Sequence, residues 1–245
     1  IKADFVGYND VKSLSDGIGK PENELCISCH TGEYGVLNPN LDWFIMNVLV
    51  IGSGGREHAI CKSISHSNLL SKLYCSPGNP GISSIAECVT IDVNNNVDVL
   101  DFCKTSNIDM VIVGPEIPLA NGMVDYLEKG GVKAFGPNSS AAELESSKIF
   151  MKEICKKYEL PTARYVEFSD PDSAFKYVSI SDYPIVIKAD GLAAGKGVTI
   201  AHNVDDANNA ITDCLIDHKF GNSGNKIVIE EFIEGKEASY FVITD

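Results

Sequence analysis

The sequence predicts an α/β protein in which a parallel-sheet domain is followed by a smaller α+β domain. Two observations carry this prediction. From Met46 onward, apolar runs of strand length alternate with stretches of helical length, as in a parallel sheet that is covered by helices. Beyond Ser146, two apolar runs are joined by a glycine-rich loop with no helix between them. Residues 1–45 contain few periodic apolar runs and are interpreted as a separate segment.

In the first domain, expected over residues 46–147, strands and helices alternate. Strands are predicted at 47–51, 72–75, 87–91, 109–113 and 132–135, and helices at 56–66, 97–105 and 118–129. The run DMVIV at 109–113 is apolar almost throughout, which suits a central strand. The glycine turn after the first strand and the loops SPGNPG and GPEIPL each follow a strand. They should therefore meet at the carboxyl edge of the sheet, where open α/β folds bind ligands.

The second domain is expected over residues 148–245. Its predicted helices lie at 147–158, 171–179 and 204–217, and its predicted strands at 162–168, 184–189, 198–201 and 226–232. Because the sequence stops within the strand-like run SYFVITD, this domain is expected to be incomplete.

Composition restricts the function. The formal net charge is −14, which argues against a nucleic-acid or anionic membrane surface. The chain is 44% hydrophobic, enough for a real core, and its longest apolar run is about half a membrane span. The eight cysteines lie mostly singly, which favours reduced thiols in a cytoplasmic protein.

The stretch PIVIKADGLAAGKG at 184–197 is the strongest local signal of an anion site. Gly191, Gly195 and Gly197 remove side chains where backbone amides could approach phosphates, and Lys188 and Lys196 add positive charge. The pattern fails the P-loop consensus, since three residues separate the first two glycines and a glycine replaces the hydroxyl residue. A strand–loop–strand flap over a nucleotide is predicted, and an ordinary glycine turn is the alternative.

The loops of the first domain hold a second set of candidates. GSGGREH at 52–58 follows a strand and opens a helix, a position that suits a phosphate, although Glu57 stands where a dinucleotide fingerprint needs glycine. Arg56 could add a bidentate phosphate contact, and Glu116, near two prolines, could recognise a hydroxyl or an amine. Plain tight turns are the alternative. The candidate substrate-binding residues are Gly54, Gly55, Arg56, Glu57, Asn79, Pro80, Gly81, Gly114, Pro115 and Glu116.

The end of the strand KIVIEEF is a candidate for recognising a base. Its backbone at Glu230, Glu231 and Phe232 could read an adenine edge, and Glu237 could accept hydrogen bonds from ribose hydroxyls. A solvated strand end is the alternative.

Six motifs together resemble the phosphoribosylamine–glycine ligase family of ATP-grasp enzymes: MNVLVIGSGGREHA, SPGNPG, IVGPEIPLANG, AFGPNSSAAELESSK, IVIKADGLAAGKGV and IVIEEFIEGKEAS. The resemblance runs from Met46 to the end of the sequence. It implies a Rossmann-like pre-ATP-grasp domain that binds phosphoribosylamine and a truncated ATP-grasp module that binds ATP. The ATP site implied in this way comprises Lys148, Lys188, Gly191, Gly195, Lys196, Gly197, Glu230, Glu231, Phe232, Ile233 and Glu237.

In that family ATP phosphorylates glycine, and the amine of phosphoribosylamine attacks the glycyl phosphate. The family's Mg²⁺ (or Mn²⁺) ligands are expected beyond residue 245, so no metal ligand or catalytic residue is assigned here and the chain is expected to be catalytically incomplete. Two alternatives remain open: a nucleotide-binding fragment without catalysis, and another ATP-grasp ligase, either biotin-carboxylase-like or formate-using.

Residues 1–37 carry a different resemblance, to the C-terminal tail of glutamine phosphoribosylpyrophosphate amidotransferase. Cys26 and Cys29 match a C-x-x-C pair that supplies two of four iron–sulfur ligands in some members of that family. The other two ligands are missing, so no cluster is expected. Zinc binding by this pair with His30 stays open as an alternative.

Overall fold

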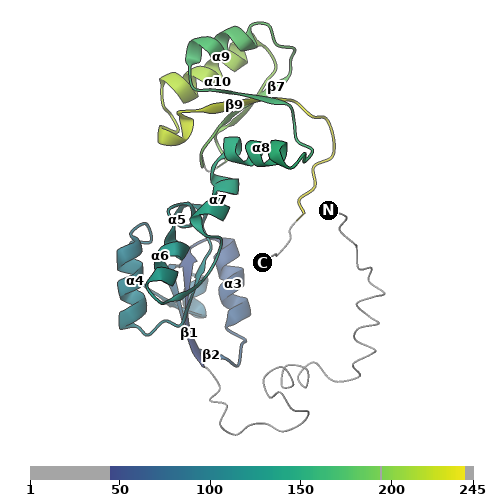
Figure 1. Cartoon of the computed structure of the whole chain (residues 1–245). Helices are drawn as coiled ribbons and strands as arrows, with labels where there is room; N and C mark the ends of the chain where they lie inside the picture. The colour runs from purple at the N-terminus through teal and green to yellow at the C-terminus, as the bar shows by residue number, and fades with distance from the viewer. Residues whose placement is uncertain (1–44, 194, 241–245) are drawn as a thin grey trace. The chain divides into compact units, whose positions relative to one another are not determined.

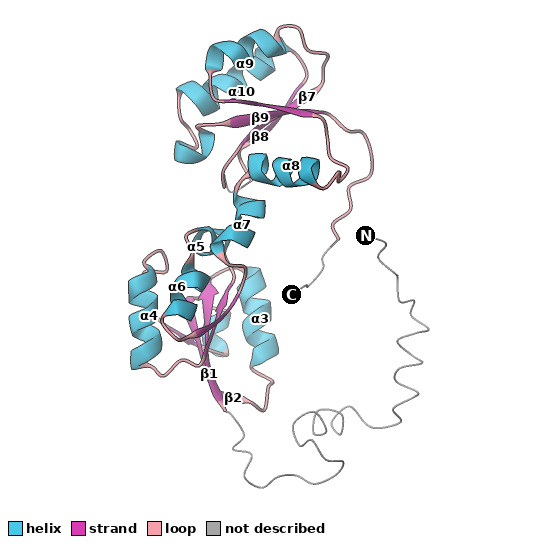
Figure 2. Ribbon diagram, in the orientation of Figure 1, coloured by secondary structure: helices cyan, strands magenta, loops and turns pink. Residues whose placement is uncertain are grey.

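The structure, a computed structural model, describes residues 45–193 and 195–240 of the 245-residue chain. These residues contain two sheets, each with its own helices and hydrophobic core (Figures 1 and 2). The predictions for residues 1–44, and for the last five residues of the strand-like run SYFVITD, concern residues outside the described ranges.

The first sheet is five-stranded and parallel, as predicted. Its order is β3-β2-β1-β4-β5, and its strands are β1 (Met46–Gly52), β2 (Leu70–Pro77), β3 (Glu87–Cys88), β4 (Met110–Val113) and β5 (Lys133–Phe135). β4 lies between β1 and β5, which confirms the interior position predicted from its apolar sequence. The strand expected over 87–91 is shorter than predicted.

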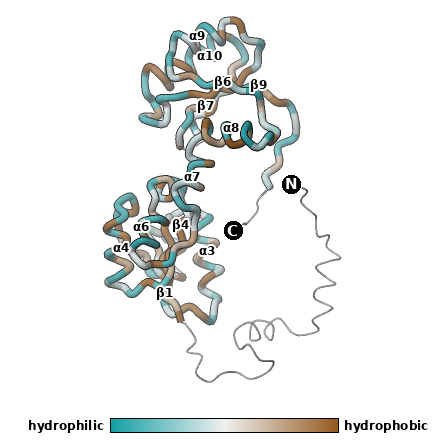
Figure 3. The backbone as a smooth tube through the Cα atoms, viewed as in Figure 1, coloured by the Kyte–Doolittle hydropathy of each residue, from teal (hydrophilic) through white to brown (hydrophobic). Residues whose placement is uncertain are grey.

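Helices cover both faces of this sheet. Successive side chains of a strand point to opposite faces, so Leu49 and Ile51 of β1 pack into one core with α4 (Asn96–Thr105) and α6 (Met123–Lys129). Val48 and Val50 pack into the other core with α3 (Gly55–Ile64). Figure 1 shows β1 between α3 and α4, and Figure 3 shows the hydrophobic colouring of this strand.

Two features of the first domain differ from the prediction. The expected helix 118–129 is two helices, α5 (Glu116–Ala120) and α6, separated at Gly122, whose φ is +74°. Glu116 was expected in a loop but begins α5. Pro118 is compatible with this helix because it lies in the first turn, where backbone N–H groups have no intrahelical acceptor. A further helix, α7 (Ser139–Ser146), was not predicted; it begins after Asn138, whose side chain accepts a hydrogen bond from the Ala141 amide.

The second sheet is four-stranded and antiparallel, in the order β6-β9-β7-β8. Its strands are β6 (Tyr165–Phe168), β7 (Ile185–Ala189), β8 (Val198–Ala201) and β9 (Ile227–Glu231). The helices of this domain are α8 (Lys148–Lys157), α9 (Pro171–Val178) and α10 (Val204–Ile211), and α10 continues as a π-helical turn over Thr212–Ile216. The α+β prediction for this domain is confirmed.

One face of the second sheet packs against α9 and α10. Ile185, Ile187 and Ala189 of β7 share a buried core with Ala174 of α9 and Ile211 of α10. The neighbouring positions Val186 and Lys188 therefore belong to the opposite face. Across the described residues, no helix combines the length and the apolar character needed to cross a membrane.

Candidate functional site

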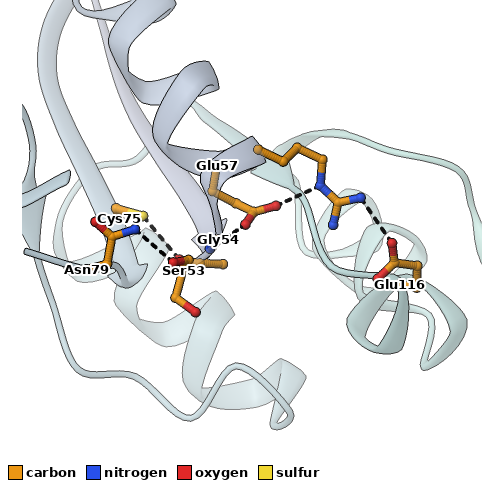
Figure 4. A network of polar contacts seen from close by, with 8 residues as sticks. Ser53, Gly54, Glu57, Cys75, Asn79 and Glu116 are labelled. Atoms are coloured by element: carbon orange, nitrogen blue, oxygen red, sulfur yellow. Dashed lines mark hydrogen bonds and ion pairs between the residues drawn. The ribbon is translucent and has the colours of Figure 1, made fainter. Parts of the chain in front are cut away.

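Three loops meet at the carboxyl edge of the parallel sheet, as expected from their positions after β1, β2 and β4. The Gly78 amide donates to the carbonyl of Gly52 at 3.1 Å, and the Gly114 amide donates to that of Ile51 at 3.1 Å. Nδ2 of Asn79 donates to the carbonyl of Ser53 at 2.8 Å (Figure 4). The candidate substrate-binding residues of this domain therefore lie in adjoining loops.

Glu57 lies beneath these loops and does not project from them. Its side chain is only 3% exposed, and Oε2 accepts a hydrogen bond from the Gly54 amide at 2.7 Å. A β-carbon on Gly52 or Gly114 would collide with this carboxylate, so the glycines leave the space that it occupies. Glu57 was predicted to contact a ligand; in this structure its carboxylate bonds instead to the Gly54 amide and to Arg56 within the loop.

Arg56 joins two of the loops. Its Nε donates to Oε1 of Glu57 at 2.8 Å, and its Nη1 donates to Oε1 of Glu116 at 3.0 Å (Figure 4). Arg56 and Glu116 are about half exposed. The hydrogen bond from Arg56 lowers the pKa of Glu116, whereas the bond to Glu57 raises the pKa of Arg56. Glu116 is therefore a partly exposed carboxylate that could accept hydrogen bonds from an amine or a hydroxyl.

Asn79 shapes its own loop. Oδ1 accepts hydrogen bonds from the amides of Gly81 at 2.8 Å and Ile82 at 2.9 Å, while Nδ2 is bonded to the carbonyl of Ser53. A β-carbon on Gly81 would lie 2.6 Å from the His58 ring, so a larger residue there would displace that ring. Both ends of the Asn79 amide are thus used to hold the turn at Pro80.

The glycine-rich loop joins β7 to β8 as an antiparallel hairpin, which confirms the predicted strand–loop–strand arrangement. Gly197 closes the hairpin by accepting a hydrogen bond from the Ala189 amide at 2.8 Å. Gly191 donates to the carbonyl of Ser223 at 3.1 Å, and the Ser223 hydroxyl donates to the carbonyl of Leu192 at 2.8 Å. Gly195 has φ +76° and open space around it, and such a residue allows close approach of a ligand to the backbone.

Lys148 lies at the base of this loop. Its Nζ donates to the carbonyls of Asp190 at 3.3 Å and Gly191 at 3.2 Å. The Asp190 carboxylate accepts a hydrogen bond from the Ile149 amide at 2.8 Å, which ties the start of α8 to the loop. Burial lowers the pKa of Lys148, the charge of Asp190 opposes this shift, and the charge of Lys188 adds to it. The charge of Lys188 thus disfavours the protonated form of Lys148, and a bound anion would relieve this repulsion.

Lys188 projects from β7 on the face opposite α9 and α10, and it pairs with Glu230 of β9. Nζ of Lys188 lies 2.8 Å from Oε2 of Glu230. Nζ of a second lysine, Lys152 of α8, lies 3.4 Å from the same oxygen. Glu230 is 5% exposed and Lys152 is 2% exposed. The Glu230 side chain is therefore bound to lysines, and its backbone is what remains for the expected adenine contact.

Lys152 was not among the predicted site residues. Its one sequence signal is helical spacing: it lies three residues after Ile149, and both residues are buried on α8. That spacing indicates an inward-facing lysine, but it does not name the carboxylate that neutralises it.

The remaining nucleotide-site candidates lie nearer to solvent. Glu231 pairs with Arg164, whose Nε is 2.6 Å from Oε2, and hydrogen bonds from Arg164 lower the pKa of Glu231. Phe232 and Ile233 follow β9 with 37% and 64% of their surfaces exposed. Lys196 and Glu237 are exposed.

A metal ion has no evident site in the part of the chain that the structure describes. In these residues no three His, Cys, Asp or Glu side chains come close enough to hold one. Cys26, Cys29 and His30 lie outside the described residues.

Comparison with solved structures defines the class of the protein. The structure of phosphoribosylamine–glycine ligase from Thermotoga maritima aligns with a TM-score of 0.63 and 27% identity, over 78% of this chain and 44% of that one. The biotin carboxylase domain of a Hydrogenobacter thermophilus 2-oxoglutarate carboxylase shares the fold, with a TM-score of 0.60 and 20% identity over 77% and 44% of the two chains. The two sheets, joined in this order and with this glycine hairpin, are those of an ATP-grasp protein with its preceding Rossmann-like domain.

Sequence comparison defines the family. Residues 46–145 match the N domain of phosphoribosylglycinamide synthetase, and residues 146–245 match its ATP-grasp (A) domain. The chain belongs to this family of ligases. It is 50% identical over 200 residues to phosphoribosylamine–glycine ligase of Mesorhizobium japonicum, and 49% identical over 193 residues to the chloroplastic ligase of Arabidopsis thaliana. These matches cover 82% and 78% of this chain, but 47% and 36% of the relatives. The chain thus spans about half the length of the bacterial relative and a smaller share of the plant relative.

Proposed function

We propose that the chain provides the phosphoribosylamine site and part of the ATP site of a phosphoribosylamine–glycine ligase. The reaction joins glycine to 5-phosphoribosylamine and converts ATP to ADP and phosphate, with glycyl phosphate as the intermediate and glycinamide ribonucleotide as the product. It belongs to purine biosynthesis, and its expected location is the cytoplasm. The identities of about 50% to enzymes of this name support the proposal, and they favour it over a biotin-carboxylase-like or formate-using ligase.

The observation that carries the nucleotide half of the proposal is the β7–β8 hairpin with Lys148 and Lys188 at its base. Gly195 leaves backbone open to an approaching ligand, and the two ammonium groups supply positive charge in a partly desolvated place. A polyphosphate satisfies both requirements, because it is strongly anionic and accepts many hydrogen bonds. The exposed Lys196 would add a third cation as the loop closes over the phosphates.

The loops at the edge of the parallel sheet form the proposed phosphoribosylamine site. Glu116 offers an ionised carboxylate to the ribose hydroxyls or the amine, and Arg56 offers N–H donors to the 5-phosphate. Gly54 and Gly55 open α3, whose N-terminus favours a phosphate. The buried carboxylate of Glu57 offsets part of that preference, so Arg56 is the main source of positive charge for the phosphate.

The described residues contribute positioning and charge to the reaction. Holding ATP by Lys148, Lys188 and the glycine loop fixes the direction in which its γ-phosphate points, and the lysines neutralise charge as the phosphoryl group is transferred. Magnesium, if bound, would supply further neutralisation of the phosphate charge. No cluster among the described residues fits that ion, so none of them is assigned to it.

Calorimetric titration of the whole chain with ATP, ADP, AMP and adenosine tests the nucleotide site. Because the lysines and the loop act on phosphates, the affinity should rise with each added phosphate and should be weakest for adenosine. Adenosine binding as tight as that of ATP would contradict the phosphate cradle. Binding of ATP without formation of ADP in the presence of glycine and phosphoribosylamine would select the alternative of a nucleotide-binding fragment.

A further inference from the structure

Lys152 is buried, and its ammonium group has two hydrogen-bond acceptors and one carboxylate at ion-pair distance. Its Nζ donates to Oγ1 of Thr162 at 2.7 Å and to the carbonyl of Ala163 at 3.2 Å, and it lies 3.4 Å from Oε2 of Glu230. Lysine is almost never fully buried unless its charge is paired. Because Lys152 is 2% exposed, it cannot itself reach a ligand in this structure.

Glu230 connects this buried lysine to the partly exposed Lys188. Its Oε2 is shared by the two ammonium groups, whereas Oε1 is buried and has no hydrogen-bond partner among the described residues. Exposure of the side chains increases along the series, from 2% at Lys152 through 5% at Glu230 to 27% at Lys188. The three charged groups thus form a row from the interior to the nucleotide face of the sheet.

The charges of these three groups do not cancel. Two ammonium groups and one carboxylate leave one positive charge, and the one end exposed to solvent is Lys188. Without Lys152, the Glu230 carboxylate would neutralise Lys188 and weaken its attraction for an anion. Without Glu230, nothing described would hold the Lys188 ammonium group at its present position.

We infer that Lys152 and Glu230 are positioning residues for Lys188. Glu230 sets the position of the Lys188 ammonium group, and Lys152 neutralises Glu230 so that the charge of Lys188 remains available to a polyphosphate. This inference rests on the proposed nucleotide site and assigns to the Glu230 side chain a role other than contact with the base.

A charge-balanced pair of variants tests this arrangement. Lys152→Met removes the buried cation and should weaken binding of both ATP and inorganic tripolyphosphate by about tenfold, because the two remaining charges, on Glu230 and Lys188, cancel. Adding Glu230→Gln to Lys152→Met removes the negative charge, while the amide oxygen of glutamine can still accept the hydrogen bond that positions Lys188. The double variant therefore has one positive charge at Lys188 and should recover most of the lost affinity. The salt dependence of ATP binding should fall in Lys152→Met and return in the double variant.

Lys156→Met is the matched control, since Lys156 lies one turn further along α8 and is exposed. It should leave both affinities within about twofold of the unchanged chain, as an exposed charge is screened by solvent. Circular dichroism establishes that each variant is folded. If Lys152→Met does not fold, the double variant still tests the inference, because it retains one positive charge and should bind tripolyphosphate nearly as tightly as the unchanged chain.

The results separate this inference from the proposed function. If the unchanged chain bound neither ATP nor tripolyphosphate, both the proposed function and this inference would be overturned. Normal binding by the unchanged chain and by Lys152→Met, or a double variant no better than Lys152→Met, would overturn the inference alone. If Lys152→Met lost as much affinity for adenosine as for ATP, the inference would also be overturned, since Glu230 would then act on the base.

Discussion

The carboxylate of Glu57 occupies the space beside Gly114 that a β-carbon at this position would fill. Glu57 belongs to α3 and Gly114 to the loop after β4, so their contact couples two of the three loops at the sheet edge. We predict that Gly114→Ala displaces Glu57 and lowers the free energy of unfolding by about 1–3 kcal/mol, the usual cost of overpacking. Urea denaturation followed by circular dichroism measures the change.

Gly55→Ala is the control for this substitution. Nothing lies within 4 Å of a β-carbon built on Gly55, and alanine favours the helix that begins there. Its stability should equal or slightly exceed that of the unchanged chain. If Gly114→Ala is as stable as Gly55→Ala, Glu57 is not confined in the way that we describe.

The buried pair of Lys152 and Glu230 should also matter for stability. Lys152→Met leaves Glu230 paired with Lys188 alone and removes the buried donor to Thr162 and Ala163, which costs about 1–3 kcal/mol. We therefore predict a loss of this size in the free energy of unfolding for Lys152→Met, and a smaller loss when Glu230→Gln is added. Equilibrium denaturation of the two variants and of Lys156→Met provides the comparison. A loss below about 1 kcal/mol for Lys152→Met would mean that its contacts with Glu230, Thr162 and Ala163 do not stabilise the fold.

The lowered pKa of Lys148 predicts a pH dependence of ATP binding. Burial holds this pKa below its ordinary value of 10.5, and a bound phosphate favours the protonated lysine. ATP affinity should therefore decrease as the pH rises through the lowered pKa. In the same window, between the lowered pKa and 10.5, the unfolded chain binds more protons than the ligand-free folded chain. The contribution of Lys148 to the free energy of unfolding therefore increases with pH there.

Lys148→Arg separates this effect from general alkaline changes, because arginine stays charged throughout the range. Titrations with ATP at several alkaline pH values should show a weaker dependence in this variant than in the unchanged chain. Parallel pH profiles would show that Lys148 does not titrate in contact with the phosphates.

The sequence predicted the features of the fold that depend on local pattern. Alternating apolar runs identified the parallel sheet, and the absence of a helix between the runs at 184–189 and 198–201 identified the hairpin that carries the glycine loop. The prediction was wrong at Glu116, because two nearby prolines favour a loop although proline is also compatible with the first turn of a helix. The helix at 139–146 was missed because its sequence, SSAAELES, has little apolar periodicity.

The site was harder to predict because pairing between distant residues decides the role of each side chain. Glu230 follows an apolar strand, which indicates a strand end, yet its charge is balanced by Lys152 and Lys188, both remote in sequence. Glu57 is similar: its place in the motif indicates contact with a ligand, whereas glycines in two other loops make room for it inside. Sequence spacing along one segment carries no information on such pairs.

The nucleotide site at the β7–β8 hairpin is tested most directly by titrating ATP into the chain and into Lys188→Ala. Loss of one charge-assisted phosphate contact should weaken ATP binding by about ten- to a hundredfold. Lys176→Ala serves as the control, since Lys176 is exposed on α9, which packs on the other face of the sheet. The account predicts this loss for Lys188→Ala and unchanged affinity for Lys176→Ala. If the unchanged chain binds ATP and Lys188→Ala binds it equally well, the nucleotide phosphates are not held at this hairpin.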